Sequence, residues 1–170
     1  MFKSIFVLFI ISLLFAFKVN SKEKPNVLFI ISDDLTATAV SSYENKACYT
    51  PNIDKLASEG VMYTSAYCQF PVCGPSRASL MFGYYPHATG TFGYTSGREN
   101  VGDRKSWPQL FMDNGYKSMR VCKIYHMGVP IHISQGSNGE DDSLSWNERY
   151  NSKGLEYLSP GEGELVQNNP

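Results

Sequence analysis

The feature that most constrains the fold is a continuous apolar run near the amino terminus. Residues 26–32 read NVLFIIS and are followed at once by Asp33 and Asp34. A short run without polar interruption is typical of a parallel β-strand that is buried on both faces. The sequence therefore predicts an α/β protein with this strand inside a mainly parallel sheet. We expect it to lie beside a strand over residues 116–123, because both segments end in candidate site residues.

Asp33 and Asp34 come where the predicted strand ends, at the edge of the sheet where α/β proteins bind ligands. Two adjacent carboxylates repel each other unless a cation lies between them, and hard oxygen ligands suit Ca²⁺ or Mg²⁺. A plain turn is the alternative, since Asp is common in turns. The residues alone leave both interpretations open.

A second stretch, residues 73–83, reads CGPSRASLMFG. The proline suits the first turn of a helix, so the pattern predicts a helix over residues 76–82 that ends at Gly83. Cys73 would precede a helix N-terminus, which favours anions, and Arg77 would add a permanent cation. This indicates a reactive group facing a sulfate or phosphate. A structural cysteine at a loop–helix junction is an equally good interpretation.

Further helices and strands are predicted around these two stretches. Thr50 as N-cap, Pro51 and Gly60 delimit one helix, with Ile53, Leu56 and Ala57 as its buried stripe. Ser106 caps a second helix, which ends at Gly115. Residues 61–67 and 116–123 are interpreted as strands, and the glycine-rich residues 90–102 as a surface loop.

Lys123 and His126 follow the last predicted strand. At the carboxyl end of a strand, a lysine and a histidine can grip an oxyanion and transfer a proton. A surface lysine beside a partly buried histidine is the plainer alternative. His87 is interpreted as a loop histidine, with lining of a substrate pocket as its alternative role.

Residues 1–21 have the pattern of a signal peptide, with Lys3 before the apolar run Ile5–Phe17 and a cleavage site after Ser21. The run is short for a membrane span, so no stable span is expected after cleavage, and an uncleaved anchor is the alternative. The mature chain would then enter the secretory pathway and be secreted, periplasmic or lysosomal. An oxidising compartment would permit a disulfide such as Cys48–Cys68.

The composition of the 170 residues is that of one ordinary globular domain, with 42% hydrophobic and 18% charged residues. A net charge of −1 argues against binding to nucleic acid. After Pro130 the sequence becomes polar, and we expect loops in which only Leu144 and Trp146 are buried. His132, Asp141 and Asp142 match no ligand spacing and are assigned to these loops.

Four stretches together resemble type I sulfatases. C-x-P-S-R with the following L-x-x-G, over Cys73–Gly83, resembles their signature, and N-V-L-x-I-x-x-D-D resembles their opening. T-P-N-I-D-x-L-A also recurs in the family, where it is structural. K-x-x-H-x-G, with two residues between Lys123 and His126, resembles the iduronate 2-sulfatase group. Phe82, Tyr84 and Cys122 depart from the usual Thr, Arg and Gly, and the resemblance extends from about Asn26 to Pro130.

The resemblance implies an alkaline phosphatase-like α/β sandwich with a mainly parallel sheet, of which residues 22–170 would be the amino-terminal portion. It also implies hydrolysis of sulfate esters of a sulfated sugar, such as a glycosaminoglycan. A formylglycine-generating enzyme would oxidise Cys73 to formylglycine, and one Ca²⁺ would be bound by Asp33, Asp34 and the modified Cys73. Cys73, Arg77, Lys123 and His126 would be catalytic, with the last two also binding substrate.

Family members are several hundred residues long and carry further metal ligands downstream. We therefore expect this chain to be an amino-terminal piece that is inactive alone. Two other functions are compatible with the residues. A metallo-phosphodiesterase of the alkaline phosphatase-like superfamily would use Ser or Thr as nucleophile, which Cys73 disfavours, and a secreted non-catalytic module would hold Cys73 in a disulfide.

Overall fold

The computed structural model describes residues 23–128 and 131–152. The predicted signal peptide at residues 1–21 lies outside the described residues, as does the predicted polar segment from residue 153 onward. The chain divides into two units, Met1–Asp34 and Leu35–Pro170, and each is described by itself. No helix within the described ranges is long and apolar enough to cross a membrane.

In the first unit, the expected strand over residues 26–32 is absent. These residues have no helical or strand structure, and the side chain of Leu28 is 85% exposed. A β-strand exists only when its backbone N–H and C=O groups pair with a neighbouring strand. The strands found among the described residues pair with each other and do not include residues 26–32, so the prediction of a strand there is wrong, while its expected place beside residues 116–123 stays a prediction.

The second unit opens with two 3₁₀ turns, η1 (Ala37–Ala39) and η2 (Ser41–Tyr43), and helix α2 (Pro51–Glu59). The bounds of α2 match the prediction, with Thr50 before it and Gly60 after it. Asp54 joins α2 to η2, because it accepts hydrogen bonds from Ser41 Oγ at 2.6 Å and Thr50 Oγ1 at 3.1 Å.

The apolar stripe predicted for α2 is not buried. Ile53 is 44% exposed and Leu56 is 67% exposed, because the contact that α2 makes with η2 is polar. Residues 61–67, predicted as a strand, have no regular structure and are exposed for the same reason as residues 26–32. Both errors concern apolar segments for which the described chain supplies no covering element.

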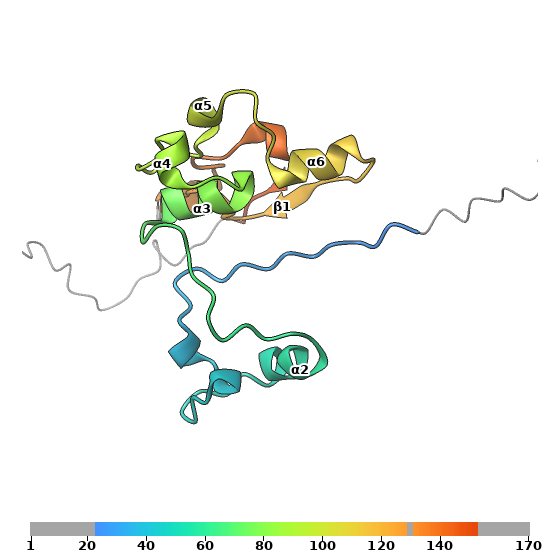
Figure 1. The fold of residues 1–170 in the computed structure, drawn as a ribbon, viewed down its shortest axis with the longest axis vertical. Helices are drawn as coiled ribbons and strands as arrows, with labels where there is room; N and C mark the ends of the chain where they lie inside the picture. The colour runs from blue at the N-terminus through green and yellow to red at the C-terminus, as the bar shows by residue number, and fades with distance from the viewer. Residues whose placement is uncertain (1–22, 129–130, 153–170) are drawn as a thin grey trace, which may run out of the picture. The chain divides into compact units, whose positions relative to one another are not determined.

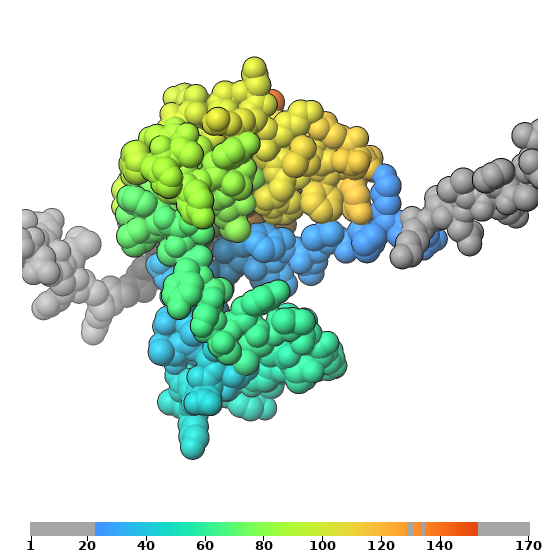
Figure 2. Space-filling model, in the orientation of Figure 1, coloured from blue at the N-terminus to red at the C-terminus, as the bar shows by residue number. Residues whose placement is uncertain are grey.

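Four helices form the packed part of the second unit: α3 (Cys73–Phe82), α4 (Pro86–Thr89), α5 (Arg98–Val101) and α6 (Trp107–Asp113). Figure 1 shows them gathered near strand β1 (Met119–Val121), and in Figure 2 the elements from α3 to β1 form a continuous mass. Its apolar core consists of Ala78, Met81, Phe82, Val101 and Tyr125. Helix α5 lies within residues 90–102, which the sequence predicted to be a surface loop.

The ends of α3 and α6 are set by local chemistry. Helix α3 begins three residues earlier than predicted, because Ser76 N–H already donates to Val72 O at 3.0 Å. It ends as predicted at Gly83, whose φ of 71° lies in the left-handed region that favours glycine. Helix α6 follows Ser106, whose N–H donates to Gln109 Oε1 at 2.9 Å in a capping box.

The sheet of the described residues has two parallel strands, β1 (Met119–Val121) and β2 (Glu148–Tyr150). Helix α7 (Ile131–Gln135) and the 3₁₀ turn η3 (Ser143–Ser145) precede β2. Residues 131–152 are thus not a plain loop region, contrary to the prediction. Leu144 is 56% exposed, so its predicted burial is also wrong, whereas Trp146 packs against the core.

Two buried ion pairs explain why residues 131–152 fold onto the core. Arg120 donates to Asp141, with side chains 1% and 3% exposed, and Arg98 donates to Asp142, whose side chain is 1% exposed. Buried charges of this kind require a partner with good geometry. The two aspartates look like loop residues in the sequence, because their arginine partners lie 20 or more residues away.

Candidate active site

Helix α3 carries Cys73 and Arg77 one turn apart, and residues at this spacing share a face of a helix. Opposite this face lies the segment of residues 123–126, which follows β1. Cys73 Sγ lies 3.1 Å from His126 Nδ1, within hydrogen-bonding distance for sulfur. Residues 53 positions apart in the sequence therefore meet at one point, as the resemblance led us to expect.

Arg77 joins the same two elements through the backbone. Its Nη1 donates to Ile124 O at 2.8 Å and lies 3.5 Å from Lys123 O. The residue is only 8% exposed. A guanidinium keeps its charge when buried and offers several donors in one plane. Arg77 thus holds residues 123–126 against α3, while its predicted contact with a sulfate stays a prediction.

Tyr125 anchors the segment from its other side. The residue is 1% exposed, and its ring packs against Phe82 with centroids 5.9 Å apart. Its hydroxyl lies 2.9 Å from Ser145 Oγ, which donates to Asp142 Oδ2 at 2.6 Å. Residues 124–126 are therefore fixed between α3 and the residues after α7, and this fixes the position of the His126 backbone.

The environment of His126 favours the neutral imidazole. Burial lowers the pKa of His126 below its usual range, and the positive charge of Lys123 lowers it further, against an opposing effect of Glu140. A neutral imidazole has one ring nitrogen free to accept a proton. Lys123 is half-buried three residues before His126 and close enough for its charge to act on the imidazole, while the predicted roles of the two residues stay predictions.

Tyr94 was not singled out by the sequence and lies directly at this site. Its ring stacks on the imidazole of His126, with centroids 4.6 Å apart and an interplanar angle of 28°. The residue belongs to the glycine-rich stretch between α4 and α5. The sequence there has no hydrophobic periodicity from which a role for Tyr94 could be predicted. The stretch TFGY, an aromatic pair in a glycine-rich loop, was the one available signal.

Cys122, where the family usually has glycine, has a φ of 56°. This left-handed conformation is the one that glycine adopts without cost, which gives a physical reason for glycine at this position. The Cys122 Sγ atom lies 3.1 Å from Ser152 Oγ, and this hydrogen bond lowers the pKa of the Cys122 thiol. All four cysteines are free, so the disulfide considered for Cys48 and Cys68 is not formed.

Asp33 and Asp34 close the first unit in a turn, and both are exposed. Their carboxylates are the hard oxygen donors that suit Ca²⁺. The described residues contain no group of three or more His, Cys, Asp or Glu side chains placed to hold a metal ion. The two aspartates therefore have the right donor atoms for the expected cation. They would supply only part of the roughly six to eight oxygen ligands that Ca²⁺ takes.

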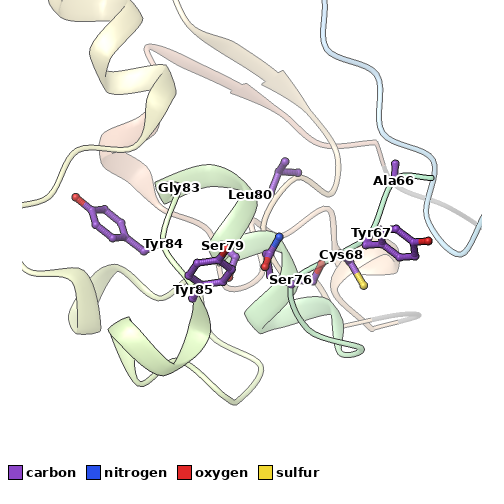
Figure 3. Close-up of a pocket in the computed structure, with 10 residues that line it drawn as sticks. Ala66, Tyr67, Cys68, Ser76, Ser79, Leu80, Gly83, Tyr84 and Tyr85 are labelled. Atoms are coloured by element: carbon purple, nitrogen blue, oxygen red, sulfur yellow. The ribbon is translucent and has the colours of Figure 1, made fainter. Parts of the chain in front are cut away.

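A cavity of about 640 Å³ lies on another face of α3, and Figure 3 shows the side chains that line it. Its lining residues come from α3 and from the segments before and after it: Ala66, Tyr67, Cys68, Gln69, Ser76, Ser79, Leu80, Gly83, Tyr84 and Tyr85. Neither Cys73 nor Arg77 belongs to this lining. His87 stacks on Tyr85 with centroids 5.3 Å apart. His87 thus stands beside this cavity rather than beside Cys73.

Comparison with known proteins identifies the class to which this fold and site belong. The sulfatase family model matches residues 25–137. The chain therefore belongs to the sulfatase family, and the predicted family is confirmed. It is similar to iduronate 2-sulfatase of Homo sapiens, with 40% identity over 124 residues that make up 72% of this chain and 21% of that protein.

Two further comparisons agree with this assignment. A sulfatase of Formosa agariphila is 40% identical over 117 residues, 64% of this chain and 23% of that protein. A protein solved in complex with its substrate, D-glucosamine-2-N,6-O-disulfate, is 30% identical with a TM-score of 0.54, over 62% of this chain and 21% of that one. The predicted alkaline phosphatase-like α/β fold is confirmed, and the chain spans about a fifth to a quarter of these relatives' length.

Proposed function

We propose that the protein hydrolyses sulfate esters and that its substrate is a sulfated sugar. The observation that carries the proposal is the 3.1 Å contact between Cys73 and His126 in a chain of the sulfatase family. The similarity to iduronate 2-sulfatase and to a protein solved with a sulfated glucosamine supports the substrate class. Water and the ester would give an alcohol and sulfate.

The group at position 73 would provide the nucleophile. Oxidation of Cys73 to formylglycine, by a formylglycine-generating enzyme, would supply an aldehyde whose hydrate can attack sulfur. Position 73 lies in the first turn of α3, a helix of ten residues whose N-terminal N–H groups favour negative charge. The side chain is half-buried, so it is partly shielded from solvent yet still reachable.

The other residues of the site would hold the substrate and move protons. The Nδ1 atom of neutral His126 faces position 73 and would accept a proton from the group there. Lys123, a cation three residues earlier, would balance charge on the sulfuryl oxygens. Arg77 would act by keeping Lys123 and His126 against α3, through the two carbonyls to which it donates.

A divalent cation is part of the proposal, with Asp33 and Asp34 as the ligands that this chain would contribute. Bound Ca²⁺ would neutralise charge on the sulfate group. Two carboxylates alone would bind weakly, because Ca²⁺ takes about six to eight oxygens. The signal peptide and delivery to the secretory pathway complete the proposal, since glycosaminoglycans and related polymers lie outside the cytoplasm.

The first test is chemical and uses the chain itself. The chain is expressed with a formylglycine-generating enzyme, and the tryptic peptide that contains Cys68 and Cys73 is sequenced by mass spectrometry. We expect an aldehyde at Cys73 and a thiol at Cys68, which serves as the internal control. A thiol or disulfide alone at Cys73 would refute the proposed nucleophile and favour a non-catalytic module.

The second test concerns the reaction. The protein is expressed from its native gene in the organism that carries it and is then purified. One assay uses a 2-O-sulfated uronate disaccharide, and the other compares the sulfate and phosphate esters of one fluorescent alcohol. We expect release of sulfate from the sugar and faster turnover of the sulfate ester. Faster turnover of the phosphate ester would instead favour a metallo-phosphodiesterase.

A further inference from the structure

Tyr94 holds an unusual position for an exposed aromatic residue. Its side chain is 61% exposed, yet one face of the ring covers the imidazole of His126. The Nδ1 edge of the same imidazole faces the sulfur atom of Cys73. The imidazole is therefore held between an aromatic face and the residue proposed to become the nucleophile.

The backbone that carries Tyr94 is seated on the first turn of α3. A Cβ atom built on Gly74 would come within 2.3 Å of Gly93 O and 3.0 Å of the Tyr94 Cα. Only glycine at position 74 leaves room for this approach. The residue that immediately follows Cys73 in the chain thus fixes the distance between Tyr94 and Cys73.

Neighbouring residues hold the same loop in place. Thr91 is 1% exposed, and its Oγ1 accepts a hydrogen bond from Asn100 Nδ2 at 3.0 Å. Phe92 points elsewhere, because its ring packs against Phe70 with centroids 5.8 Å apart. Thr91 therefore anchors the loop three residues before Tyr94, and the Tyr94 ring is carried by an ordered backbone.

The backbone of His126 is fixed by the hydrogen bond from Glu140 N–H to His126 O at 2.8 Å. The imidazole still has two side-chain torsions, and its contact with Cys73 Sγ restrains only one edge of the ring. Stacking restrains the plane of the ring, and offset aromatic pairs are stabilising beyond simple burial.

We propose that Tyr94 is a positioning residue, whose ring holds the plane of the His126 imidazole so that Nδ1 faces position 73. The orienting effect of the Tyr94 ring follows from the geometry alone, and only its use in catalysis rests on the proposed function. Its test uses no turnover, so its failure and the failure of sulfate hydrolysis are distinguishable. The ring is the active element, and the hydroxyl of Tyr94 is not required.

The experiment uses the full chain with Cys73 unmodified, at one fixed pH. The variants are Tyr94→Leu, which removes the ring, and Tyr94→Phe, which keeps it. The matched control is Phe92→Leu, an exposed aromatic of the same loop that packs on Phe70 rather than on His126. Circular dichroism confirms folding, and His126→Ala gives the behaviour of Cys73 without its imidazole neighbour.

Two readouts follow the geometry. The first is the upfield ring-current shift of the His126 ring protons by NMR. The second is the alkylation rate of Cys73 by iodoacetamide divided by that of exposed Cys68, resolved within one tryptic peptide. We expect Tyr94→Phe and Phe92→Leu to match the wild type. Tyr94→Leu should lose the shift and lower the rate ratio about threefold toward the His126→Ala value, since stacking weakly favours one orientation.

A wild-type spectrum without the upfield shift would overturn the proposal even if Tyr94→Leu fails to fold. An unchanged rate ratio in folded Tyr94→Leu would overturn it as well. So would an equal effect of Phe92→Leu, which would show that the loop as a whole, and not the Tyr94 ring, orients His126.

Discussion

Replacing Asp142 by Asn tests whether the buried ion pair after α7 holds the site segment. The carboxylate accepts from Arg98 Nε at 3.0 Å and from Arg98 Nη2 at 2.6 Å. It also accepts from Ser145 Oγ at 2.6 Å and Leu144 N–H at 3.2 Å. Asn has almost the same volume but one acceptor oxygen and no charge, so it cannot satisfy all of these donors.

The size of the effect follows from burial. The side chain of Asp142 is 1% exposed and that of Arg98 is 19% exposed. Removing one member of a buried ion pair costs about 3–5 kcal/mol, and the partial exposure of Arg98 places this case near 3 kcal/mol. Because small domains unfold with roughly 5–15 kcal/mol, such a loss would be a large fraction of the total.

Urea denaturation followed by circular dichroism measures this loss. The control is Asp113→Asn, which removes the partner of Lys105 from a pair whose side chains are 47% and 49% exposed. Exposed pairs contribute about 0–1 kcal/mol, so the control should lose little. If Asp142→Asn loses no more than Asp113→Asn, the network does not stabilise the segment and our reasoning fails.

The pH dependence gives a second check on the same variant. Burial alone would raise the pKa of Asp142, but hydrogen bonds from Arg98 and Ser145 outweigh it and keep the pKa below its usual range. A carboxylate with a depressed folded-state pKa stabilises the protein above its unfolded pKa of about 3.9 and loses this contribution as the pH falls. The difference between wild type and Asp142→Asn should therefore be constant near neutral pH and shrink below about pH 4.

Two further substitutions test backbone geometry by urea denaturation. Gly74→Ala should lower the free energy of unfolding by about 1–3 kcal/mol, since the new Cβ meets a backbone oxygen at 2.3 Å, whereas Gly93→Ala, with nothing within 4 Å, should have little effect. Equal effects of the two would contradict this. Cys122→Gly should raise the free energy of unfolding by about 1 kcal/mol by relieving the φ of 56°, and Cys122→Ala should not. A loss of stability in Cys122→Gly would show that the Ser152 contact outweighs the strain.

Helix ends could be predicted from the sequence because they depend on neighbouring residues. Thr50 and Pro51 start α2, Gly83 ends α3 in the left-handed conformation, and Ser106 with Gln109 caps α6. Each of these signals acts within about one turn of the helix. No distant partner is needed for them, so the local chemistry was sufficient.

Strands and buried charges could not be predicted in this way, because both depend on distant partners. Residues 26–32 have a strand-like composition, but a strand forms only against another strand. Asp141 and Asp142 look like solvent-exposed residues until Arg120 and Arg98 are found beside them. The fold of residues 131–152 is therefore determined by pairings across the chain rather than by local pattern.

The candidate site shows the same division. Cys73, Arg77, Lys123 and His126 were all named from the resemblance to type I sulfatases, and the structure brings α3 and residues 123–126 together. Tyr94 was missed, because an aromatic residue between glycines has no periodic signal. The role of Cys73 as a formylglycine precursor stays a prediction, which the mass-spectrometric test addresses, and the roles of Asp33 and Asp34 as metal ligands also stay predictions.

Arg77 has a structural role that the motif did not predict, in addition to the anion contact, which stays a prediction. The residue is 8% exposed, and its guanidinium donates to Ile124 O at 2.8 Å. A charged donor buried against carbonyls makes a strong hydrogen bond that a shorter or neutral side chain could not replace. Any shift of α3 must therefore carry Ile124 with it, and His126 two residues later. The distance between Cys73 and His126 is thus maintained by Arg77 even when neither of the two reacts.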